Sequence, residues 1–238
     1  MAILPIDSGR YGTKEMLEIF GEQKKVDYQL QIEAAAALSQ SEINLIPKSI
    51  AKDIAKAARS GKITAKRIKQ LEAKSDHDTA ALVESLAERC KKESRPWIHY
   101  GLTSNDLVDT SNSMQMRDAI KVIQPKVGKL ALLLSKNAVK YKVLPAVGRT
   151  HGQHASIISF GLKFANWASE MATHLERLDE IKKRILICKT LGVVGTGSLM
   201  GKDAVKVQER VAKKLLLFPA KVTTQIIPRE RYAEYIFQ

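Results

Sequence analysis

The fold is decided by residues 103–139, which read TSNDLVDTSNSMQMRDAIKVIQPKVGKLALLLSKNAV. The first four residues are of the kinds that begin a helix, and apolar side chains then recur at helical spacing. This stripe consists of Leu107, Met114, Ile120, Ile123, Val127, Leu130, Leu134 and Val139. We expect Pro125 to kink the helix without ending it. The stretch therefore predicts one very long helix.

A second long stripe follows between residues 160 and 185, and we expect the two helices to pack antiparallel. Its members are Phe160, Phe164, Trp167, Met171, Leu175, Leu178, Ile181 and Ile185. At ~1.5 Å per residue, helices of this kind extend roughly 45 to 60 Å, more than the width of a compact domain of this size. Residues 130–134 are apolar nearly all round, so a two-helix pair leaves one face bare. We expect helices of other subunits to cover it.

Most of the remaining chain has a helical pattern too. A helix begins after Thr13 and runs to a break at 41–47, and further helices are expected at 48–59, 64–73, 75–92, 202–216 and 229–238. Residues 186–200 are rich in glycine and β-branched residues, which predicts a loop or a small β-hairpin. The fold class is therefore all-α, with an N-terminal helical domain (1–104) and a long-helix bundle domain (105–238). Because the last residues lack a helix stop signal, we expect a truncated form with an incomplete second domain.

Composition limits the classes of function. The 238 residues include 45% hydrophobic ones, enough for a substantial core, and 39 basic against 25 acidic residues give a formal charge of +14. This charge favours an anionic partner: nucleic acid, an acidic membrane surface or a small polyanionic metabolite. Cys90 and Cys188 lie far apart without metal-ligand spacing, so we expect reduced thiols and no zinc. With no secretory leader and no membrane-spanning run, a soluble cytoplasmic protein is expected.

The segment most suited to chemistry is Gly148-Arg149-Thr150-His151-Gly152-Gln153-His154-Ala155, which separates the two long stripes. A histidine beside glycine, where one helical pattern stops and another starts, can face a ligand. Its ordinary pKa lets it move a proton near neutral pH. The chemistry is therefore expected around His151.

Six separated segments together resemble the adenylosuccinate lyase family of the fumarase and aspartase superfamily. They are Ser8-Gly9-Arg10-Tyr11, Asp76-His77-Asp78, residues 99–110 (HYGLTSNDLVDT), residues 148–155, Gly192-Val193-Val194-Gly195-Thr196 and Thr224-Gln225. They occur in the family's order across almost the whole chain. The Thr-Ser-x-Asp-x-x-Asp-Thr and Thr-His-Gly-x-x-Ala elements belong to the wider superfamily, whereas the Arg-Tyr, His-Asp and Thr-Gln elements point to the adenylosuccinate branch.

The resemblance implies a β-elimination that breaks the C–N bond of adenylosuccinate to give AMP and fumarate, and that cleaves the related succinyl-carboxamide ribotide of purine synthesis. A base takes the proton beside a carboxylate, N–H or cationic donors hold the resulting aci-carboxylate, and an acid protonates the departing nitrogen. By position His151 matches the family's general acid. His77 matches the catalytic-site histidine near the substrate phosphate, at a helix N-terminus that favours an anion.

The resemblance also implies the residues that bind the anionic nucleotide. Thr103 and Ser104 suit a carboxylate of the succinyl group, and Arg10 and Tyr11 suit the phosphate and ribose. In or beside the family motifs, we also expect Asp76, Asp78 and Gln225 to bind substrate, and His99 and His154 to form supporting hydrogen bonds. The family requires no metal and no cofactor, and it assembles its active site from three subunits of a tetramer. A homotetramer that binds neither nucleic acid nor membrane is therefore expected.

The chain departs from the family pattern in three places. Asp76 replaces a usual basic residue before the His-Asp pair, and Ala155-Ser156-Ile157-Ile158-Ser159-Phe160 replaces Ala-Glu-Pro-Thr-Thr-Phe. The mobile loop Ser-Ser-x-Met-Pro-x-Lys-x-Asn, whose serine is the general base, is not present in residues 1–238. We therefore expect the base beyond residue 238 and no turnover by this chain alone.

Two alternative functions remain open. One is another lyase of the superfamily, acting on argininosuccinate or a carboxymuconate, although the Arg10-Tyr11 and Thr224-Gln225 pairs favour a nucleotide. The other is a basic helical protein that binds nucleic acid or acts as a scaffold. Only 5% of the residues are aromatic, and no helix-turn-helix or base-stacking motif is present, which counts against nucleic-acid binding.

Overall fold

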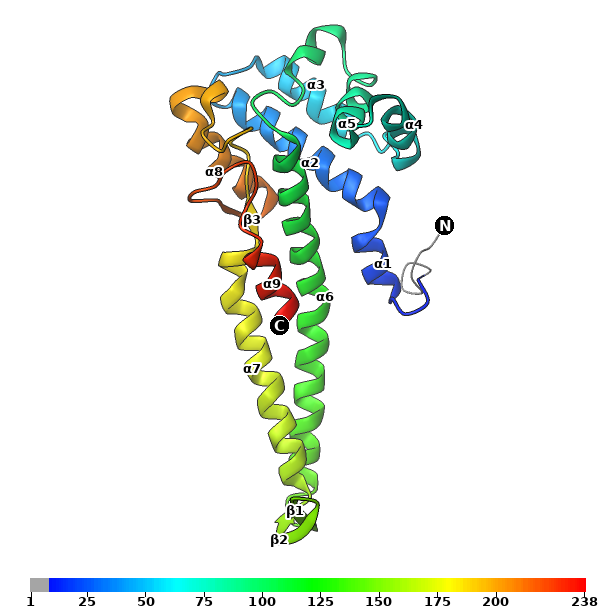
Figure 1. Cartoon of the computed structure of the whole chain (residues 1–238), viewed down its shortest axis with the longest axis vertical. Coiled ribbons are helices and arrows are strands. Elements are labelled where there is room, and N and C mark those ends of the chain that lie inside the picture. The colour runs from blue at the N-terminus through cyan, green and yellow to red at the C-terminus, as the bar shows by residue number, and fades with distance from the viewer. Residues whose placement is uncertain (1–8) are drawn as a thin grey trace. The chain divides into compact units, whose positions relative to one another are not determined.

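The computed structural model describes residues 9–238, so Ser8 of the first motif lies outside the described residues. Its α-helices are α1 (Lys14–Phe20), α2 (Glu22–Ser41), α3 (Lys48–Ala58), α4 (Ala65–Ser75), α5 (Asp78–Ala87), α6 (Ser104–Lys140), α7 (Gly161–Ile185), α8 (Ala204–Leu215) and α9 (Glu230–Phe237) (Figure 1). Short 3-10 helices η2 (Lys92–Trp97) and η3 (Ser198–Asp203) lie between them. The predominantly helical fold class is confirmed, and α6 continues through Pro125 as expected.

Two small pairs of strands accompany the helices. Strands β1 (Pro145–Thr150) and β2 (Gln153–Ser159) form an antiparallel hairpin around His151, where the sequence pattern predicts only a break between two long helices. Strand β3 (Ile187–Cys188) pairs in parallel with β4 (Phe218–Pro219). The segment 186–200 is therefore a loop with one very short strand, and not a hairpin.

The described chain packs as two units. Unit 1 comprises residues 9–118 and 183–233, and unit 2 comprises residues 119–182 and 234–238. Helices α6, α7 and α9 each have residues in both units. The domain boundary expected at residues 104–105 stays a prediction.

Unit 1 is built around α2, which packs against α3 and α8, while α4 packs against α5. Most of α2 is buried, including Tyr28, Ile32 and the run Ala34–Ala37. Small alanine side chains let neighbouring helices approach this face closely, which explains how one helix serves several partners. Thr13 and Thr64 cap α1 and α4 by accepting hydrogen bonds from Met16 N and Arg67 N, so the chain turns into each helix at a defined residue.

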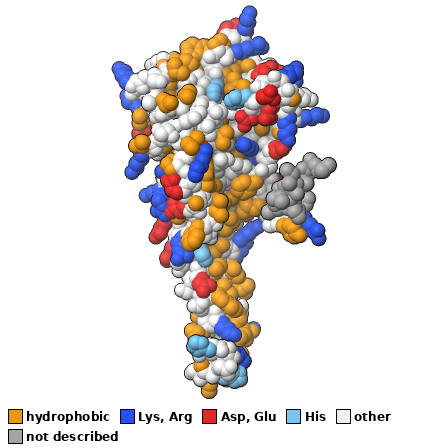
Figure 2. Space-filling model, in the orientation of Figure 1, with side chains coloured by type: hydrophobic (Ala, Val, Ile, Leu, Met, Phe, Trp, Pro, Cys, Tyr) orange, Lys and Arg blue, Asp and Glu red, His pale blue; other side chains and the backbone are white. Residues whose placement is uncertain are grey.

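In unit 2, the second part of α6 runs antiparallel to α7, as the sequence predicts. Lys182 donates a hydrogen bond to Gln124 Oε1 (2.9 Å) near one end, and the ring of Tyr141 stacks on Phe164 (5.8 Å between centroids) near the other. Many large apolar side chains of this unit are exposed, and Figure 2 shows hydrophobic side chains on its visible face. They include Leu130, Leu132, Leu133, Val139, Val143, Leu144, Ile157, Leu162 and Trp167. No helix of residues 9–238 combines the length and the apolar character that crossing a bilayer requires.

Candidate active site

A pocket of about 260 Å³ in unit 1 brings together three residues that the sequence singles out. It is lined by His77, Thr79, Ala80, Val83, His99 and Ser104. Thr79 and Ala80 belong to the first turn of α5, and Ser104 is the first residue of α6. The N-termini of two helices therefore converge on the pocket, and their unpaired N–H groups and positive dipole ends favour an anion there.

His77 caps the N-terminus of α5. Its Nδ1 accepts a hydrogen bond from Ala80 N at 3.2 Å, so His77 is the N-cap residue. The helix predicted from residue 75 would instead have placed His77 inside its first turn. A neutral ring that accepts at Nδ1 carries its proton at Nε2. The capping interaction thus fixes the tautomer and leaves Nε2–H as a donor.

His99, in the turn between η2 and α6, is held by a buried carboxylate of α2. Its Nδ1 lies 2.6 Å from Glu33 Oε1, and its backbone N–H donates to Glu33 Oε2 at 3.0 Å. The Glu33 side chain is 2% exposed and that of His99 20%. Burial lowers the pKa of His99, but the hydrogen bond and charge of Glu33, together with the charge of Asp106, outweigh it and raise the pKa above its ordinary value. The His99 ring is therefore protonated more readily than that of an ordinary histidine.

The start of α6 leaves two hydroxyl groups available. Thr103 N donates to Asp106 Oδ2 at 2.9 Å, which is one half of a capping box, whereas Asp106 N donates to the backbone carbonyl Thr103 O at 2.9 Å and not to the Thr103 hydroxyl. Within residues 9–238, neither the Thr103 nor the Ser104 hydroxyl forms a hydrogen bond to another side chain or to the backbone. Because the Asp106 carboxylate caps the helix, both hydroxyl groups can serve a ligand.

Asp106 also joins this helix start to the glycine-rich loop 192–197. Its carboxylate, which is fully buried, forms an ion pair with Lys189, also fully buried, and accepts a hydrogen bond from Gly192 N at 2.9 Å. Burial raises the pKa of Asp106 above its ordinary value, against the charge of Lys189 and the N–H groups of Thr103 and Gly192, which lower it.

The second aspartate of the motif, Asp109, holds a different segment. Its buried carboxylate accepts hydrogen bonds from Ile227 N (2.9 Å), the Arg229 guanidinium (2.6 Å) and the Tyr232 hydroxyl (3.1 Å). The two loops held in this way also touch each other at Gly195, where a Cβ atom would lie 2.3 Å from Thr223 O. The first turns of α6 are therefore a common anchor for the loops 189–197 and 223–229.

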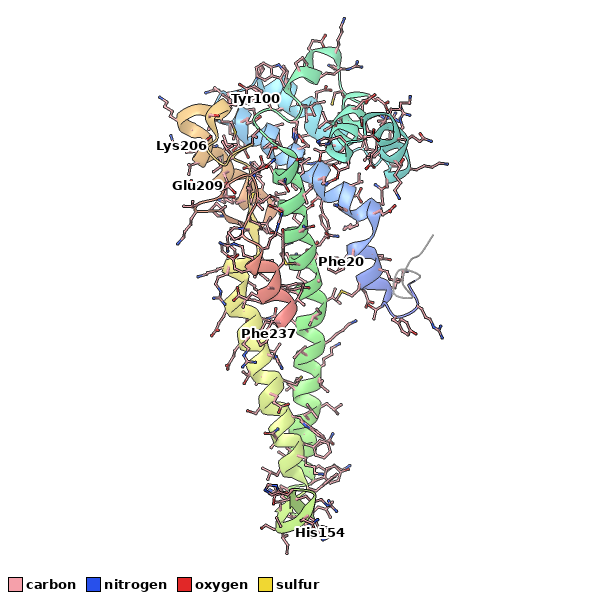
Figure 3. All side chains as sticks on the ribbon, viewed as in Figure 1. Phe20, Tyr100, His154, Lys206, Glu209 and Phe237 are labelled. Atoms are coloured by element: carbon pink, nitrogen blue, oxygen red, sulfur yellow. The ribbon has the colours of Figure 1, made fainter. Side chains whose placement is uncertain are left out.

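In unit 2, His151 occupies the turn of the β1–β2 hairpin. Thr150 pairs with Gln153, so His151 and Gly152 form a two-residue turn, with φ of 51° and 73°. Two consecutive positive φ values are typical of the type I′ turn, which joins twisted strands without splaying them. His151 is exposed, and Arg149 Nη2 lies 3.3 Å from Nε2 of His154, which Figure 3 labels at the hairpin. The turn therefore leaves the His151 side chain accessible on the surface of unit 2.

The other expected site residues lie outside the unit 1 pocket. The guanidinium of Arg10 stacks 5.6 Å from the ring centre of Tyr11, and both side chains are exposed. Asp76 ends α4 in a left-handed conformation (φ 52°), and Asp78 binds the N–H and hydroxyl of Thr79. Gln225 is exposed on the loop that contacts Gly195.

A larger groove of about 740 Å³ lies elsewhere in unit 1, between α2, the end of α3 and the end of α8. Its charged lining residues are Lys24, Asp27, Arg59 and Lys214, and it contains no histidine and none of the residues singled out by the sequence. We therefore assign the candidate site to the smaller pocket, where imidazoles, a hydroxyl and helix N-termini converge.

Sequence reasoning missed three groups that shape the site: Glu33, Lys189 and Arg229. Glu33 is the easiest of the three to recognise from the sequence as a buried charge, because it directly precedes the apolar run Ala34–Leu38. Lys189 and Arg229 give no such signal, because a lysine or arginine in a basic chain is normally a surface residue.

Comparisons with known proteins agree on one family. A family model described as "Lyase" matches residues 9–238. Adenylosuccinate lyase of Methanocaldococcus jannaschii is 43% identical over 237 residues, which are 100% of this chain and 51% of that protein. Adenylosuccinate lyase of Methanothermobacter thermautotrophicus is 39% identical over 99% of this chain and 52% of its own length.

A solved structure has the same fold. The fumarate lyase from Mesorhizobium sp. BNC1 superimposes with a TM-score of 0.88 at 29% identity, covering 95% of this chain and 54% of that one. The chain thus spans about half the length of the curated relatives and of the structure it matches. Since the family model matches residues 9–238 and the alignments to both curated relatives cover 99–100% of this chain, the chain belongs to this lyase family.

Proposed function

We propose that the chain is part of an adenylosuccinate lyase, which eliminates fumarate from adenylosuccinate to leave AMP and acts likewise on the succinyl-carboxamide ribotide of purine biosynthesis. The observation that carries the proposal is the convergence of His77, His99 and Ser104 on one pocket at two helix N-termini. The names of the curated relatives support the same substrate.

The pocket suits the charge that develops during β-elimination. Removal of a proton beside a carboxylate converts it into an aci-carboxylate with additional negative charge, which donors in fixed positions stabilise. The hydroxyl groups of Thr103 and Ser104 and the N-terminus of α6 would bind this carboxylate, and the imidazolium of His99 would add a positive charge nearby. His77, whose Nε2–H is a donor, would face the substrate phosphate.

His151 would act as the general acid that protonates the departing nitrogen. Its place in an exposed two-residue turn makes it available to a pocket on another copy of the chain, as a site shared between subunits requires. The exposed apolar side chains of unit 2 support the same assembly, a homotetramer. Arg10, Tyr11 and Gln225 would bind the nucleotide, and the serine base would lie beyond residue 238. We place the protein in the cytoplasm, without a metal or cofactor.

The function is tested with the longest form of the protein that the gene encodes. Adenylosuccinate, argininosuccinate and a carboxymuconate are supplied separately, and the loss of each substrate is followed by absorbance and product chromatography. We expect cleavage of adenylosuccinate to AMP and fumarate alone. The 238-residue chain, assayed in parallel, should bind AMP or fumarate without turnover.

Cleavage of argininosuccinate in place of adenylosuccinate would overturn the substrate assignment and keep the reaction class. Tight, salt-dependent binding to random DNA at physiological ionic strength, with no cleavage of any of the three substrates, would favour the nucleic-acid-binding alternative.

A further inference from the structure

The fully buried lysine at position 189 is unusual for this residue type, which is almost never removed from water unless its charge is paired. Its ammonium forms an ion pair with Asp106 and lies 3.5 Å from Gly192 O. Its backbone N–H and C=O both hydrogen-bond the Thr110 hydroxyl at 3.0 Å. Both the backbone and the side chain of Lys189 are thus attached to the first turns of α6.

The two oxygens of Asp106 have separate partners. Oδ1 faces the Lys189 ammonium, whereas Oδ2 accepts from Thr103 N and from Gly192 N, each at 2.9 Å. A single oxygen atom therefore joins the start of α6 to the first residue of the glycine loop. This bridge is strongest with an ionised carboxylate, because a protonated one is a weaker acceptor and has a proton to place.

The charge of the Lys189 ammonium helps to keep the Asp106 carboxylate ionised and so strengthens the bridge. In a dry interior an unpaired carboxylate takes up a proton, and burial already raises the pKa of Asp106. A neighbouring ammonium opposes this effect and favours the charged form. Removing the ammonium would therefore weaken both backbone hydrogen bonds at once, although neither of them involves the lysine directly.

We propose that Lys189 is a positioning residue for substrate binding, whose ammonium holds Asp106 ionised and thereby sets the place of Thr103 and Ser104 relative to the loop 192–197. The inference rests on the proposed function, in which these two hydroxyl groups bind the succinyl carboxylate. Lys189 itself touches no substrate, because it is fully buried behind Asp106.

The test compares Lys189→Met, which keeps an unbranched side chain only one atom shorter and removes the charge, with the wild type, in the longest form of the protein that the gene encodes. The readouts are kcat, KM for adenylosuccinate and the inhibition constants of the two products, fumarate and AMP. We expect the inhibition constant of fumarate to rise and kcat/KM to fall by ~10-fold or more, as displaced binding groups produce. The inhibition constant of AMP should rise less than that of fumarate, because the displaced Thr103 and Ser104 hydroxyl groups would bind the succinyl carboxylate and not the nucleotide.

Two further variants separate positioning from general loss of stability. Leu71→Ala removes a buried side chain of α4 that does not line the pocket, and we expect it to lower Tm without changing the ratio of the two inhibition constants. Should Lys189→Met fail to fold because Asp106 is left buried and unpaired, the double variant Lys189→Met with Asp106→Asn removes both charges. It should fold and show the same selective loss of fumarate binding.

An active wild type together with a folded Lys189→Met or double variant that binds fumarate as the wild type does would overturn the positioning role alone. Equal weakening of fumarate and AMP would also overturn it, in favour of a structural role. A wild type that does not cleave adenylosuccinate would overturn the proposed function and, with it, this inference.

Discussion

Protonation of His99 depends on one carboxylate, that of Glu33. Without it, only burial and the more distant charge of Asp106 act on the ring, and burial lowers its pKa. We expect the His99 imidazole to titrate above its ordinary pKa of ~6.5 in the wild type and below it in Glu33→Gln. NMR titration of the histidine Cε1–H signals measures both values. Glu93→Gln, at an exposed position, is the control and should leave the His99 titration unchanged.

The same pair makes stability depend on pH in a defined direction. Because the pKa of His99 is higher in the folded than in the unfolded chain, its contribution is complete below ~6.5 and is lost as the pH rises through the folded value. Glu33→Gln should therefore cost about 2 kcal/mol of unfolding free energy at pH 6, the strength of a charged hydrogen bond, and less at pH 9. Urea unfolding at the two pH values checks this, and an equal cost at both would contradict it.

Turnover should depend on His151 far more than on its neighbour His154. Loss of a general acid lowers a rate by ~100-fold or more, so His151→Ala in the longest form of the protein should reduce kcat to this extent without disturbing assembly. His154→Ala removes only the contact with Arg149 and should cost less than about tenfold. Steady-state kinetics with adenylosuccinate compares the two, and near-normal turnover of His151→Ala would refute its role.

These residues also mark the limit of what sequence can predict. The sequence motifs identify His77, His99 and Ser104, and the structure places all three on one pocket. The sequence alone does not reveal that His99 pairs with Glu33, 66 positions away, or that Lys189 pairs with Asp106. Such pairs arise from the packing of distant segments, and neither partner differs in type from the many charged surface residues of the chain.

At the scale of elements, the loop 192–197 is fixed by a close approach that only glycine allows. Gly195 has φ +78°, and its Cβ would lie 2.3 Å from Thr223 O, whereas Gly61 has φ +68° and open space around it. Gly61→Ala should cost only the ~1–2 kcal/mol of a left-handed backbone. Gly195→Ala must also move the loop 223–229, so we expect at least about 2 kcal/mol more. Urea unfolding of both variants measures the difference, and equal costs would show that the two loops can separate freely.

The hairpin at 145–159 shows why one element escaped prediction. Its turn signal, a histidine and a glycine between two segments that can pair, is present in the sequence. The strands, however, lack the alternation of apolar and polar residues that marks a half-buried strand, since β1 reads PAVGRT and β2 reads QHASIIS. The long helices were predictable because their apolar stripes repeat over many turns, whereas this hairpin buries little within its own chain.

For the whole molecule, the distribution of apolar surface predicts assembly. Leu132 is 65% exposed and Leu133 56%, and neighbouring leucines and valines extend the apolar surface along α6. Leaving such side chains in water forgoes about 1.5–3 kcal/mol for each one that could be buried, so the association of several copies is favourable. We expect the protein, in the longest form that the gene encodes, to have the mass of four chains in solution.

Glutamates in this surface should prevent the assembly, because burying an unpaired carboxylate costs more than the lost apolar contact. Leu132→Glu with Leu133→Glu should give single chains with unchanged helical circular dichroism, measured together with light scattering after gel filtration. Val205→Glu, at a similarly exposed position (57%) on α8 of unit 1, should keep the mass of four chains.

If His151 serves a pocket on another copy, the dissociated Leu132→Glu, Leu133→Glu variant must also lose turnover even though its own His77, His99 and Ser104 are intact. An active single chain would therefore refute the shared site, and a tetrameric double variant would refute the role of this surface.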